Sequence, residues 1–467
     1  MPTPLVRREL QTLETWYNSE NRKPLIIRGA RQVGKSTLVQ QFARHKGLSL
    51  LSVNFERNPE YRKAFSVKDP VQILATLEIL TSKTVNAKTS LVFFDEIQVA
   101  PEAIVALRYF YEEKPDIPVL AAGSLLEFSL AKADFSMPVG RIEYLHMGPM
   151  TFSDFLIALG ETSLASYLSN LTWEEIEKAA LPAVIHEKGM ALFQQYCLVG
   201  GMPEAVACFA EDRSYSKVLK AQHNVLATYR DDFNKYSHGT VTRRIQLLFD
   251  QVPALVGKRF KYVQVSKEHR AAELRNALDQ LCMARVLTRV YHSAANGVPL
   301  GAEQKQTVFK LLFMDVGLLC AVLGMGVLDF NRDEINLINK GAVAEQFIGQ
   351  HLLYSDQYYQ TPSLFYWVRE AKNAAAEVDY LLAVGQTIIP IEIKAGATGT
   401  LRSLHRFCYE KQNHFSLRFN AQPPSVLKNA WAKTHQYSIK YHLLSLPLYM
   451  VGETKRLSNQ FINSQLI

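Results

Sequence analysis

The spacing of apolar residues divides the chain into a front part that alternates strands with helices, a helical middle and a strand-rich rear. In the front part, short apolar runs recur between helical segments, at residues 25–27, 48–55, 91–94 and 119–122. Strands separated by helices predict a parallel sheet covered by helices. We therefore expect residues 1–150 to form a three-layer α/β domain.

In the middle of the chain the apolar residues have helical spacing. Residues 152–236 read as helices, interrupted at a Gly-Gly-Met-Pro turn. We interpret residues 151–236 as a helical lid or connector.

The spacing of apolar residues changes again further along the chain, where two helical segments precede two strands at residues 285–291 and 308–314. Helices followed by a two-stranded ribbon are typical of a winged helix, which we predict for residues 237–335. Such modules bind DNA or connect proteins, and both alternatives are open here. Six basic residues lie before and along the second helix, where a DNA-binding module would place them: Lys258, Arg259, Lys261, Lys267, Arg270 and Arg275.

Composition and charge narrow the class of protein only modestly. A chain of 467 residues is too long to fold around a single hydrophobic core. No apolar run approaches the roughly 18 residues of a membrane span. The first residues lack the apolar core of an export signal, and the five cysteines lack metal-site spacing. We therefore expect a cytoplasmic protein with free thiols and no membrane partner. The formal net charge of +8 is compatible with nucleic-acid binding but does not demonstrate it.

The first apolar run leads into a glycine-bounded loop, Gly29-Ala30-Arg31-Gln32-Val33-Gly34-Lys35-Ser36-Thr37, and then into a helical segment. This order is the phosphate-binding P-loop, G-x-x-x-x-G-K-[ST], in the strand–loop–helix setting that the motif needs. Backbone N–H groups would point at the phosphates of ATP, Lys35 would reach the β- and γ-phosphates, and Ser36 would hold Mg²⁺. The alternative is a glycine-rich turn that carries Gly-Lys-Ser by chance.

The third apolar run ends in two carboxylates, Asp95 and Glu96. This is the Walker B pattern, in which Asp95 completes the Mg²⁺ shell and Glu96 orients or deprotonates the attacking water. The fourth run ends at Ser124, which is either a sensor near the γ-phosphate or the N-cap of the next helix. Arg141 is a candidate for contacting the γ-phosphate of its own or a neighbouring subunit, and otherwise a surface residue at the start of a strand.

These features resemble the prokaryotic AAA+-like P-loop ATPases, as do the segments 138–141 and 149–152. The resemblance covers about the first 155 residues and implies that ATP is bound and hydrolysed with Mg²⁺, often in assemblies. A small-molecule kinase that uses ATP as phosphate donor is a further reading. The Asp95-Glu96 pair and the long rear of the chain disfavour it.

Carboxylates and a lysine recur in the strands of the last third of the chain. Asp379 opens an apolar strand, and Glu392 and Lys394 share one face at the end of the next. If these strands pair as a hairpin, the carboxylates converge with Lys394 and can bind Mg²⁺ and activate water for phosphodiester cleavage. Glu345, on an amphipathic helix upstream, could add a metal ligand. The alternative is a surface strand pair with a Glu392–Lys394 ion pair.

This pattern resembles the Asp…(Asp/Glu)-x-Lys core of the restriction-endonuclease-like superfamily, which implies an α/β domain over residues 336–467. The whole chain resembles a prokaryotic ATPase family with a C-terminal domain of unknown function, although no proline precedes Asp379. Our hypothesis is a Mg²⁺-dependent ATPase coupled to a DNA-binding or nuclease-like module. The alternative is an ATP-gated switch or scaffold that binds DNA or a protein without cleavage. A trans-acting Arg141 would in addition require self-association.

Overall fold

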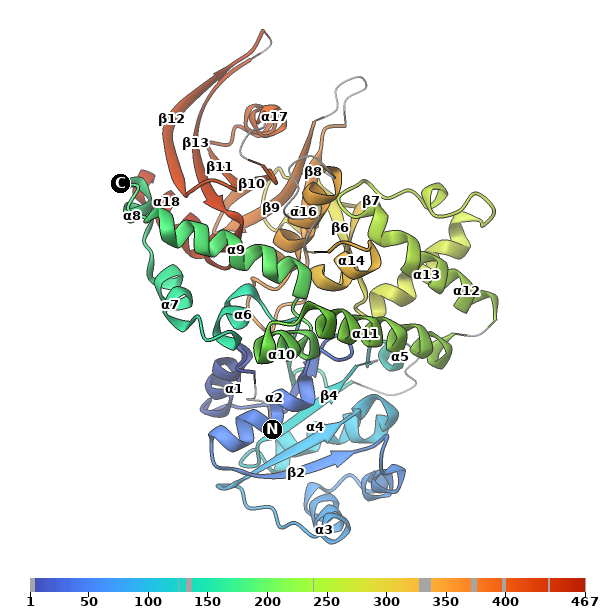
Figure 1. Ribbon diagram of the computed structural model, residues 1–467. Helices are drawn as coiled ribbons and strands as arrows, with labels where there is room; N and C mark the ends of the chain where they lie inside the picture. The colour runs from blue at the N-terminus through green and yellow to red at the C-terminus, as the bar shows by residue number, and fades with distance from the viewer. Residues whose placement is uncertain are drawn as a thin grey trace. The chain divides into compact units, whose positions relative to one another are not determined.

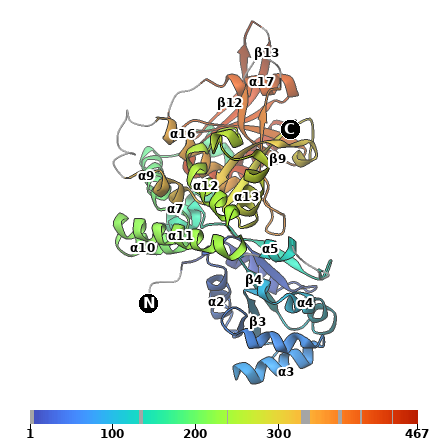
Figure 2. The ribbon, with the colours of Figure 1, turned by 90° about the vertical axis from the view of Figure 1, so that its right-hand side faces the viewer.

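The computed structural model describes residues 5–124, 126–131, 137–237, 239–326, 337–370, 376–396, 400–435 and 437–466. The chain divides into two units, which are described separately and are drawn in Figures 1 and 2. Unit 1 holds Met1–Pro149, Gln280–Val286 and Asp356–Pro362, and unit 2 holds Met150–Asp279, Leu287–Ser355 and Ser363–Ile467.

Unit 1 is built on a five-stranded parallel sheet in the order β2-β3-β4-β1-β5. The central strands β3 and β4 are buried along their length, which is why they read in the sequence as continuous apolar runs. The predicted parallel α/β sheet is confirmed. Its strands are β1 Leu25–Arg28, β2 Ser49–Asn54, β3 Ser90–Asp95, β4 Val119–Gly123 and β5 Glu143–His146. The helices of this unit are α1 Glu9–Tyr17, α2 Lys35–His45, α3 Pro70–Thr81, α4 Pro101–Glu113 and α5 Leu126–Ala131, with the 3₁₀ helices η1 Pro59–Ser66 and η2 Ile97–Val99.

The strand direction gathers polar side chains at one edge of this sheet. Because all five strands run the same way, their carboxyl ends lie together and the loops that follow them meet. The P-loop follows β1, Asn54 ends β2, Asp95 ends β3 and Ser124 follows β4. Residues that precede the strands, such as Arg141 before β5, lie at the opposite edge.

The helices predicted for residues 152–236 are present in unit 2. A capping box begins the first of them, because the Thr151 side chain accepts from Asp154 N while the Asp154 carboxylate accepts from Thr151 N. None of the helices in the described part of the chain combines the length and the apolar composition that a membrane span requires. The helices of this stretch are α6 Phe152–Ala158, α7 Thr162–Asn170, α8 Trp173–Glu177, α9 Ala183–Val199, α10 Pro203–Asp212 and α11 Tyr215–Tyr236. Further along the chain lie α12 Thr240–Gln251, α13 Ala271–Met283, α14 Val316–Val322, α16 Leu337–Leu353, α17 Arg402–Lys411 and α18 Thr454–Leu466, with the 3₁₀ helices η3 Val252–Leu255, η4 Tyr262–Gln264, η5 Leu300–Glu303 and η6 Leu448–Glu453.

Unit 2 also contains a mixed sheet of eight strands in the order β12-β13-β11-β10-β9-β8-β6-β7. Strands β9 and β10 pair antiparallel, so the hairpin predicted around Asp379 and Glu392 is confirmed. The strands are β6 Leu287–Ser293, β7 Gln304–Phe313, β8 Phe365–Val368, β9 Glu377–Val384, β10 Thr387–Ile393, β11 Phe415–Asn420, β12 Ser425–Lys433 and β13 Ser438–Pro447.

The ribbon predicted for the winged helix is present as the antiparallel pair β6–β7, but it is not a free-standing wing. Strand β6 also pairs in parallel with β8, where Tyr291 lies opposite Phe365, so the ribbon continues the sheet of the last third of the chain. An alternating pattern marks a strand without specifying which distant strand becomes its neighbour. The winged-helix and restriction-endonuclease-like assignments stay predictions, and their boundary at 335/336 lies outside the described residues.

Candidate functional site

The P-loop of unit 1 adopts a backbone that requires its two glycines. Gly34, directly before α2, has a φ of 95°, a left-handed conformation that favours glycine. At Gly29 a Cβ atom would lie 2.3 Å from the carbonyl oxygen of Met147, so a larger residue would displace the backbone. The loop leads into the N-terminus of α2, where free N–H groups and the helix dipole favour phosphate.

Lys35, the first residue of α2, lies against the loop. Its Nζ donates to the carbonyl oxygens of Gly29 at 3.1 Å and Ala30 at 2.7 Å, and the residue is buried. Burial lowers the pKa of Lys35 to about 8, while the Glu96 and Asp95 carboxylates oppose that shift. The loop carbonyls therefore hold the ammonium next to the phosphate-binding backbone.

The two predicted Mg²⁺ ligands of unit 1 lie together. Ser36 Oγ donates to the Asp95 carboxylate, 3.1 Å from each of its oxygens, and Asn54 Nδ2 donates to Asp95 Oδ2 at 3.1 Å. Burial and the neighbouring Glu96 carboxylate raise the pKa of Asp95. A hydroxyl and a carboxylate beside a phosphate-binding loop are the oxygen donors that Mg²⁺ takes alongside nucleotide phosphates. This donor set fits the ion.

Glu96 is held in an uncommon conformation beside Asp95. Its φ of 52° is left-handed, which costs energy for a residue with a side chain and is typical of functional sites. Its Oε2 accepts from Gln98 Nε2 at 2.5 Å and from Ser124 Oγ at 3.3 Å. The structure thus brings Ser124 to Glu96, while its sensor role stays a prediction. The N-cap alternative for Ser124 involves residue 125, which lies outside the described residues.

Two residues that the sequence analysis does not name, Asn54 and Gln98, complete this cluster. The sequence does contain a signal for Asn54, because this residue is the polar position at the carboxyl end of an apolar strand. The sequence contains no such signal for Gln98, because its contact with Glu96 depends on the left-handed backbone at Glu96. A Cβ on Gly123 would lie 2.3 Å from Gln98 Oε1, so a larger residue at the end of β4 would displace the Gln98 amide.

Arg141 lies away from this cluster. It precedes β5 at the edge where the strands begin, and its Nε donates to Glu112 Oε1 at 3.0 Å. The P-loop follows β1 at the other edge, and β1 and β5 are parallel, so Arg141 does not reach the loop of its own chain. The strand direction therefore corrects the expectation of a contact in cis, and a contact in trans stays a prediction.

The predicted carboxylates of unit 2 gather around a lysine that the sequence analysis does not name. Lys310, on β7, is 2% exposed. Its Nζ lies 2.8 Å from Glu345 Oε1 on α16, 2.6 Å from Glu377 Oε1 on β9 and 3.8 Å from Asp379 Oδ1 on the same strand. An ammonium group thus occupies the space between these carboxylates.

Glu392 and Lys394 pair with each other at the end of β10. Lys394 Nζ lies 2.5 Å from Glu392 Oε1, and Asp379 Oδ2 accepts from Ile393 N at 2.8 Å. The alternative of a surface strand pair predicts this ion pair. Glu392, however, is buried. Its Oε2 has no hydrogen-bond partner within the described part of the chain.

The cluster contains more carboxylates than ammonium groups. Burial raises the pKa of Glu345 to about 8, with Asp379 adding to the shift and Lys310 opposing it. Burial also raises the pKa of Glu392 to about 7. Burial alone would lower the pKa of Lys310, but the carboxylates around it outweigh this and raise its pKa, so Lys310 stays charged. Protons retained by the carboxyl groups therefore relieve the excess negative charge near neutral pH.

A divalent metal ion does not fit this arrangement. Lys310 fills the space between Glu345 and Asp379, and Lys394 is committed to Glu392. Over the described ranges, no three His, Cys, Asp or Glu side chains are placed to hold a metal ion. The metal site predicted at Glu345, Asp379 and Glu392 is therefore not formed in this structure. The physical reason is β7, which the sequence analysis assigns to a separate ribbon and which instead brings a lysine into the same sheet.

The six basic residues of the predicted winged helix are all exposed, and their DNA contact stays a prediction. Lys258 Nζ donates to the carbonyl oxygen of Ala254 at 3.2 Å. The six are Lys258, Arg259, Lys261, Lys267, Arg270 and Arg275.

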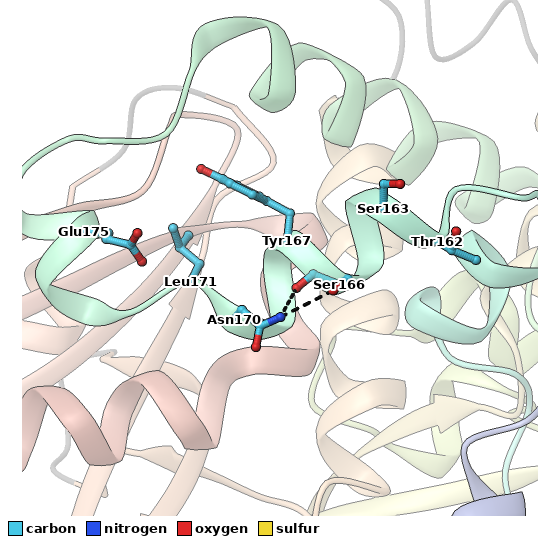
Figure 3. Close-up of a pocket in the computed structure, with 7 residues that line it drawn as sticks. All are labelled: Thr162, Ser163, Ser166, Tyr167, Asn170, Leu171 and Glu175. Atoms are coloured by element: carbon cyan, nitrogen blue, oxygen red, sulfur yellow. Dashed lines mark hydrogen bonds between the residues drawn. The ribbon is translucent and has the colours of Figure 1, made fainter.

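An open pocket of about 660 Å³ lies on α7 and α8 of unit 2 (Figure 3). Glu175, the charged residue among its lining, belongs to the capping box of α8 and accepts from Thr172 N at 2.8 Å. Asn170 Nδ2 donates to the carbonyl oxygen of Ser166 at 2.8 Å. These two polar groups therefore serve the ends of α7 and α8. The lining residues of the pocket are Thr162, Ser163, Ser166, Tyr167, Asn170, Leu171 and Glu175.

Three parts of the chain match known protein families. Residues 21–156 match the AAA domain family. Residues 190–329 and 340–449 match two families described as domains of unknown function, DUF8612 and DUF4143. The first match covers the P-loop and the parallel sheet described above. None of the curated proteins matches the chain.

Solved structures resemble the chain loosely. The Aeropyrum pernix ORC2 protein in its ADPNP–ADP complexes is 13% identical, over 69% of this chain and 95% of its own, with a TM-score of 0.35. The Aeropyrum pernix ORC1 protein in complex with DNA is 11% identical, over 69% and 94%, with a TM-score of 0.28. The C. elegans PCH-2 protein is 14% identical, over 47% and 64%, with a TM-score of 0.26. At these TM-scores the likeness carries no argument about function.

Proposed function

We propose that residues 21–156 bind ATP together with Mg²⁺ and hydrolyse the nucleotide. The observation that carries this proposal is the placement of Ser36, Asp95 and Glu96 beside the P-loop, at the carboxyl edge of the sheet. The backbone N–H groups of the loop and the Lys35 ammonium bind the triphosphate. Ser36 and Asp95 are the residues that would hold Mg²⁺, which would supply positive charge to stabilise the transferred phosphoryl group.

Glu96 acts on the attacking water in this proposal. Its Oε2 is tied to Gln98 and Ser124, which leaves Oε1 to accept a proton from water. The water oxygen bonds to the γ-phosphorus, the bond from that phosphorus to the bridging oxygen breaks, and ADP and inorganic phosphate leave. Phosphoryl transfer depends mainly on positioning and charge stabilisation, so Gln98 and Ser124 are positioning residues.

Phosphate release from ATP with Mg²⁺ tests the loop's part in this reaction. We expect Lys35→Ala to lower turnover by about a hundredfold, because it removes a charge that stabilises the transferred phosphoryl group. Lys88→Ala is the matched control, since Lys88 is exposed and lies before β3, at the edge away from the loop. Wild-type release no faster than that of Lys35→Ala would contradict the proposal.

We further propose that unit 2 binds a partner without cleaving it, and that ATP acts as its switch. The observation that favours this reading is Lys310, whose ammonium lies where a nuclease of this type would need a metal ion. A buried charge pair of this kind stabilises one arrangement of the cluster and does not supply an activated water.

Incubation of supercoiled plasmid with the protein, Mg²⁺ or Mn²⁺, and ATP tests this reading. The plasmid should stay supercoiled with wild type. Nicking that needs metal and is lost in Lys394→Ala would contradict the non-cleaving reading. Equal nicking by both preparations would identify a contaminating nuclease, and the wild type would then count as inactive.

A further inference from the structure

One segment of unit 2 carries a strong excess of basic over acidic residues. Residues 393–452 contain eight Lys or Arg residues and one acidic residue, Glu410. A comparable excess lies at residues 213–290, which contain 15 basic and 6 acidic residues. Residues 393–452 therefore have a formal net charge of +7, and they contain α17, β11, β12 and β13.

The outer half of the β12–β13 hairpin extends beyond its neighbour in the sheet (Figures 1 and 2). Strand β13 pairs with β11 only from His442 onward, so the part before it pairs with β12 alone. On this outer part Trp431 lies opposite Lys440, and Lys433 follows two residues after Trp431 on the same face. We call Trp431, Lys433 and Lys440 the ribbon surface.

The ribbon surface is open to solvent and has uncompensated charge. Trp431 is 69% exposed, and both lysines are exposed. Neither Lys433 nor Lys440 forms an ion pair within the described ranges, whereas Lys428, at the inner end of β12, pairs with Glu177. A large aromatic ring and two free ammonium groups thus share one accessible face.

The opposite face of the hairpin is packed and supports this surface. Ala430, Ala432 and Ile439 alternate with the exposed residues and join the apolar cluster under α17. At the margin of α17, Tyr409 stacks on Tyr437 with ring centroids 4.8 Å apart, which adds aromatic area beside the tip. The ribbon is therefore a fixed platform and its exposed tryptophan is not part of a core.

Protection of a sheet edge explains only part of this pattern. Strand β12 is the edge strand, and lysines on edge strands prevent pairing with other chains. Lys440, however, lies on β13, which is paired on both sides further along. An exposed tryptophan on an edge strand works against such protection, because it adds apolar surface to the edge. The combination of ring and charge needs another explanation.

We propose that the ribbon surface binds single-stranded nucleic acid. An unpaired base stacks on the Trp431 ring, and Lys433 and Lys440 contact the phosphates on either side of it. Aromatic rings that stack bases, set among basic residues that follow the backbone, are the recurring device of single-strand binding. In a duplex the bases are stacked on one another and offer no face to this ring. The proposal names the partner of unit 2 and rests on the non-cleaving role proposed above.

Fluorescence anisotropy with a labelled oligodeoxythymidine about 20 nucleotides long tests this surface. We expect binding that weakens with salt, and a Lys433→Glu/Lys440→Glu variant whose salt slope is smaller by about 1.4, at about 0.7 per lost phosphate contact. Trp431→Ala should bind about tenfold more weakly, and Trp431→Phe should recover much of the loss because a ring remains. Lys68→Glu/Lys220→Glu is the charge-matched control, since both lysines are exposed and lie outside the segment.

Tryptophan fluorescence reports the contact directly. The other three tryptophans, Trp16, Trp173 and Trp367, are each less than 5% exposed, so quenching by unlabelled oligonucleotide would arise at Trp431. Quenching should be present in wild type and in the control variant and absent in Trp431→Phe.

Four results would overturn the proposal. They are no binding at low salt, equal loss in the charge-matched control, tighter binding to a duplex of the same length without quenching, and binding to phosphatidylserine vesicles in place of the oligonucleotide. ATP turnover is measured in the same preparations. Lost binding with intact turnover would refute this surface alone and leave the ATPase proposal standing.

Discussion

The Lys310 ammonium lies 2.8 Å from the Glu345 carboxylate, joining β7 to α16 inside unit 2. Both side chains are largely buried, and the Lys310 ammonium opposes the rise in the pKa of Glu345 that burial causes. The sequence predicts a metal ligand at Glu345, and the structure supplies a lysine as the cation instead. The proposed non-cleaving role of unit 2 depends on this contact, which can be tested by removing the ammonium.

Replacement of Lys310 should destabilise unit 2 and open the cluster to metal. In Lys310→Met the apolar stem is retained but the carboxylates are uncompensated, so the free energy of unfolding should fall by about 3–5 kcal/mol. Mn²⁺ should raise the melting temperature of this variant and leave that of wild type unchanged. Lys220→Met, at an exposed position, is the control. Equal stabilisation of wild type by Mn²⁺ would show that Lys310 does not take the place of a metal ion.

The stability of unit 2 should fall as the pH rises from about 5 to about 8. The folded-state pKa values of Glu345 and Glu392 are about 8 and about 7, above their ordinary values near 4.5. A carboxyl group with a raised pKa holds its proton more tightly when folded, so it stabilises the folded state at low pH and loses this contribution as the pH rises through the folded-state pKa. Urea unfolding at pH 5.5 and pH 8 measures the difference, which should shrink in Glu345→Gln. An unchanged difference in that variant would exclude Glu345 as the source.

Removal of Gln98 should lower kcat and leave the KM for ATP nearly unchanged. The Gln98 amide orients the Glu96 carboxylate from 2.5 Å, and a displaced base costs about tenfold to a hundredfold in rate. Steady-state phosphate release by Gln98→Ala measures this, with Gln72→Ala at an exposed position of α3 as the control. A raised KM with an unchanged kcat would show that Gln98 serves nucleotide binding instead of orienting Glu96.

Loss of Arg141 should leave turnover within about twofold of wild type in dilute protein. Its guanidinium pairs with Glu112 at the edge of the sheet away from the loop. An arginine that contacts the transferred phosphoryl group is worth about a thousandfold or more, so the two cases are easily separated. A large loss in Arg141→Ala at concentrations where the chain is monomeric would place this residue in its own site. A loss confined to high concentration would identify a contact in trans.

The P-loop domain could be predicted from the sequence because its signals are local. Gly34, Lys35 and Ser36 are adjacent in the chain, and Asp95 ends a continuous apolar run. Parallel strands buried on both faces produce such runs whatever lies beside them. Strand direction then brings Ser36 and Asp95 together, as the hydrogen bond between them shows.

The cluster of unit 2 could be predicted only in part, because its decisive contact is not local. The β9–β10 hairpin could be predicted from two apolar runs joined by a short turn, so Asp379 and Glu392 could be placed as neighbours. Lys310 lies in a strand whose partners are chosen by tertiary packing, and nothing in its own segment points to Glu345. Gln98 was missed for a related reason, since a left-handed turn at Glu96 decides where its side chain lies.

Replacement of Glu96 by glutamine tests whether this residue is the base of an ATP-hydrolysing site. The measurement pairs phosphate release in Mg²⁺ with equilibrium binding of a fluorescent ATP analogue, and Glu113→Gln, at an exposed position of α4, is the control. We expect Glu96→Gln to bind the analogue like wild type and to lose turnover by about a hundredfold. Turnover in Glu96→Gln equal to that of wild type and of Glu113→Gln would contradict this role of Glu96.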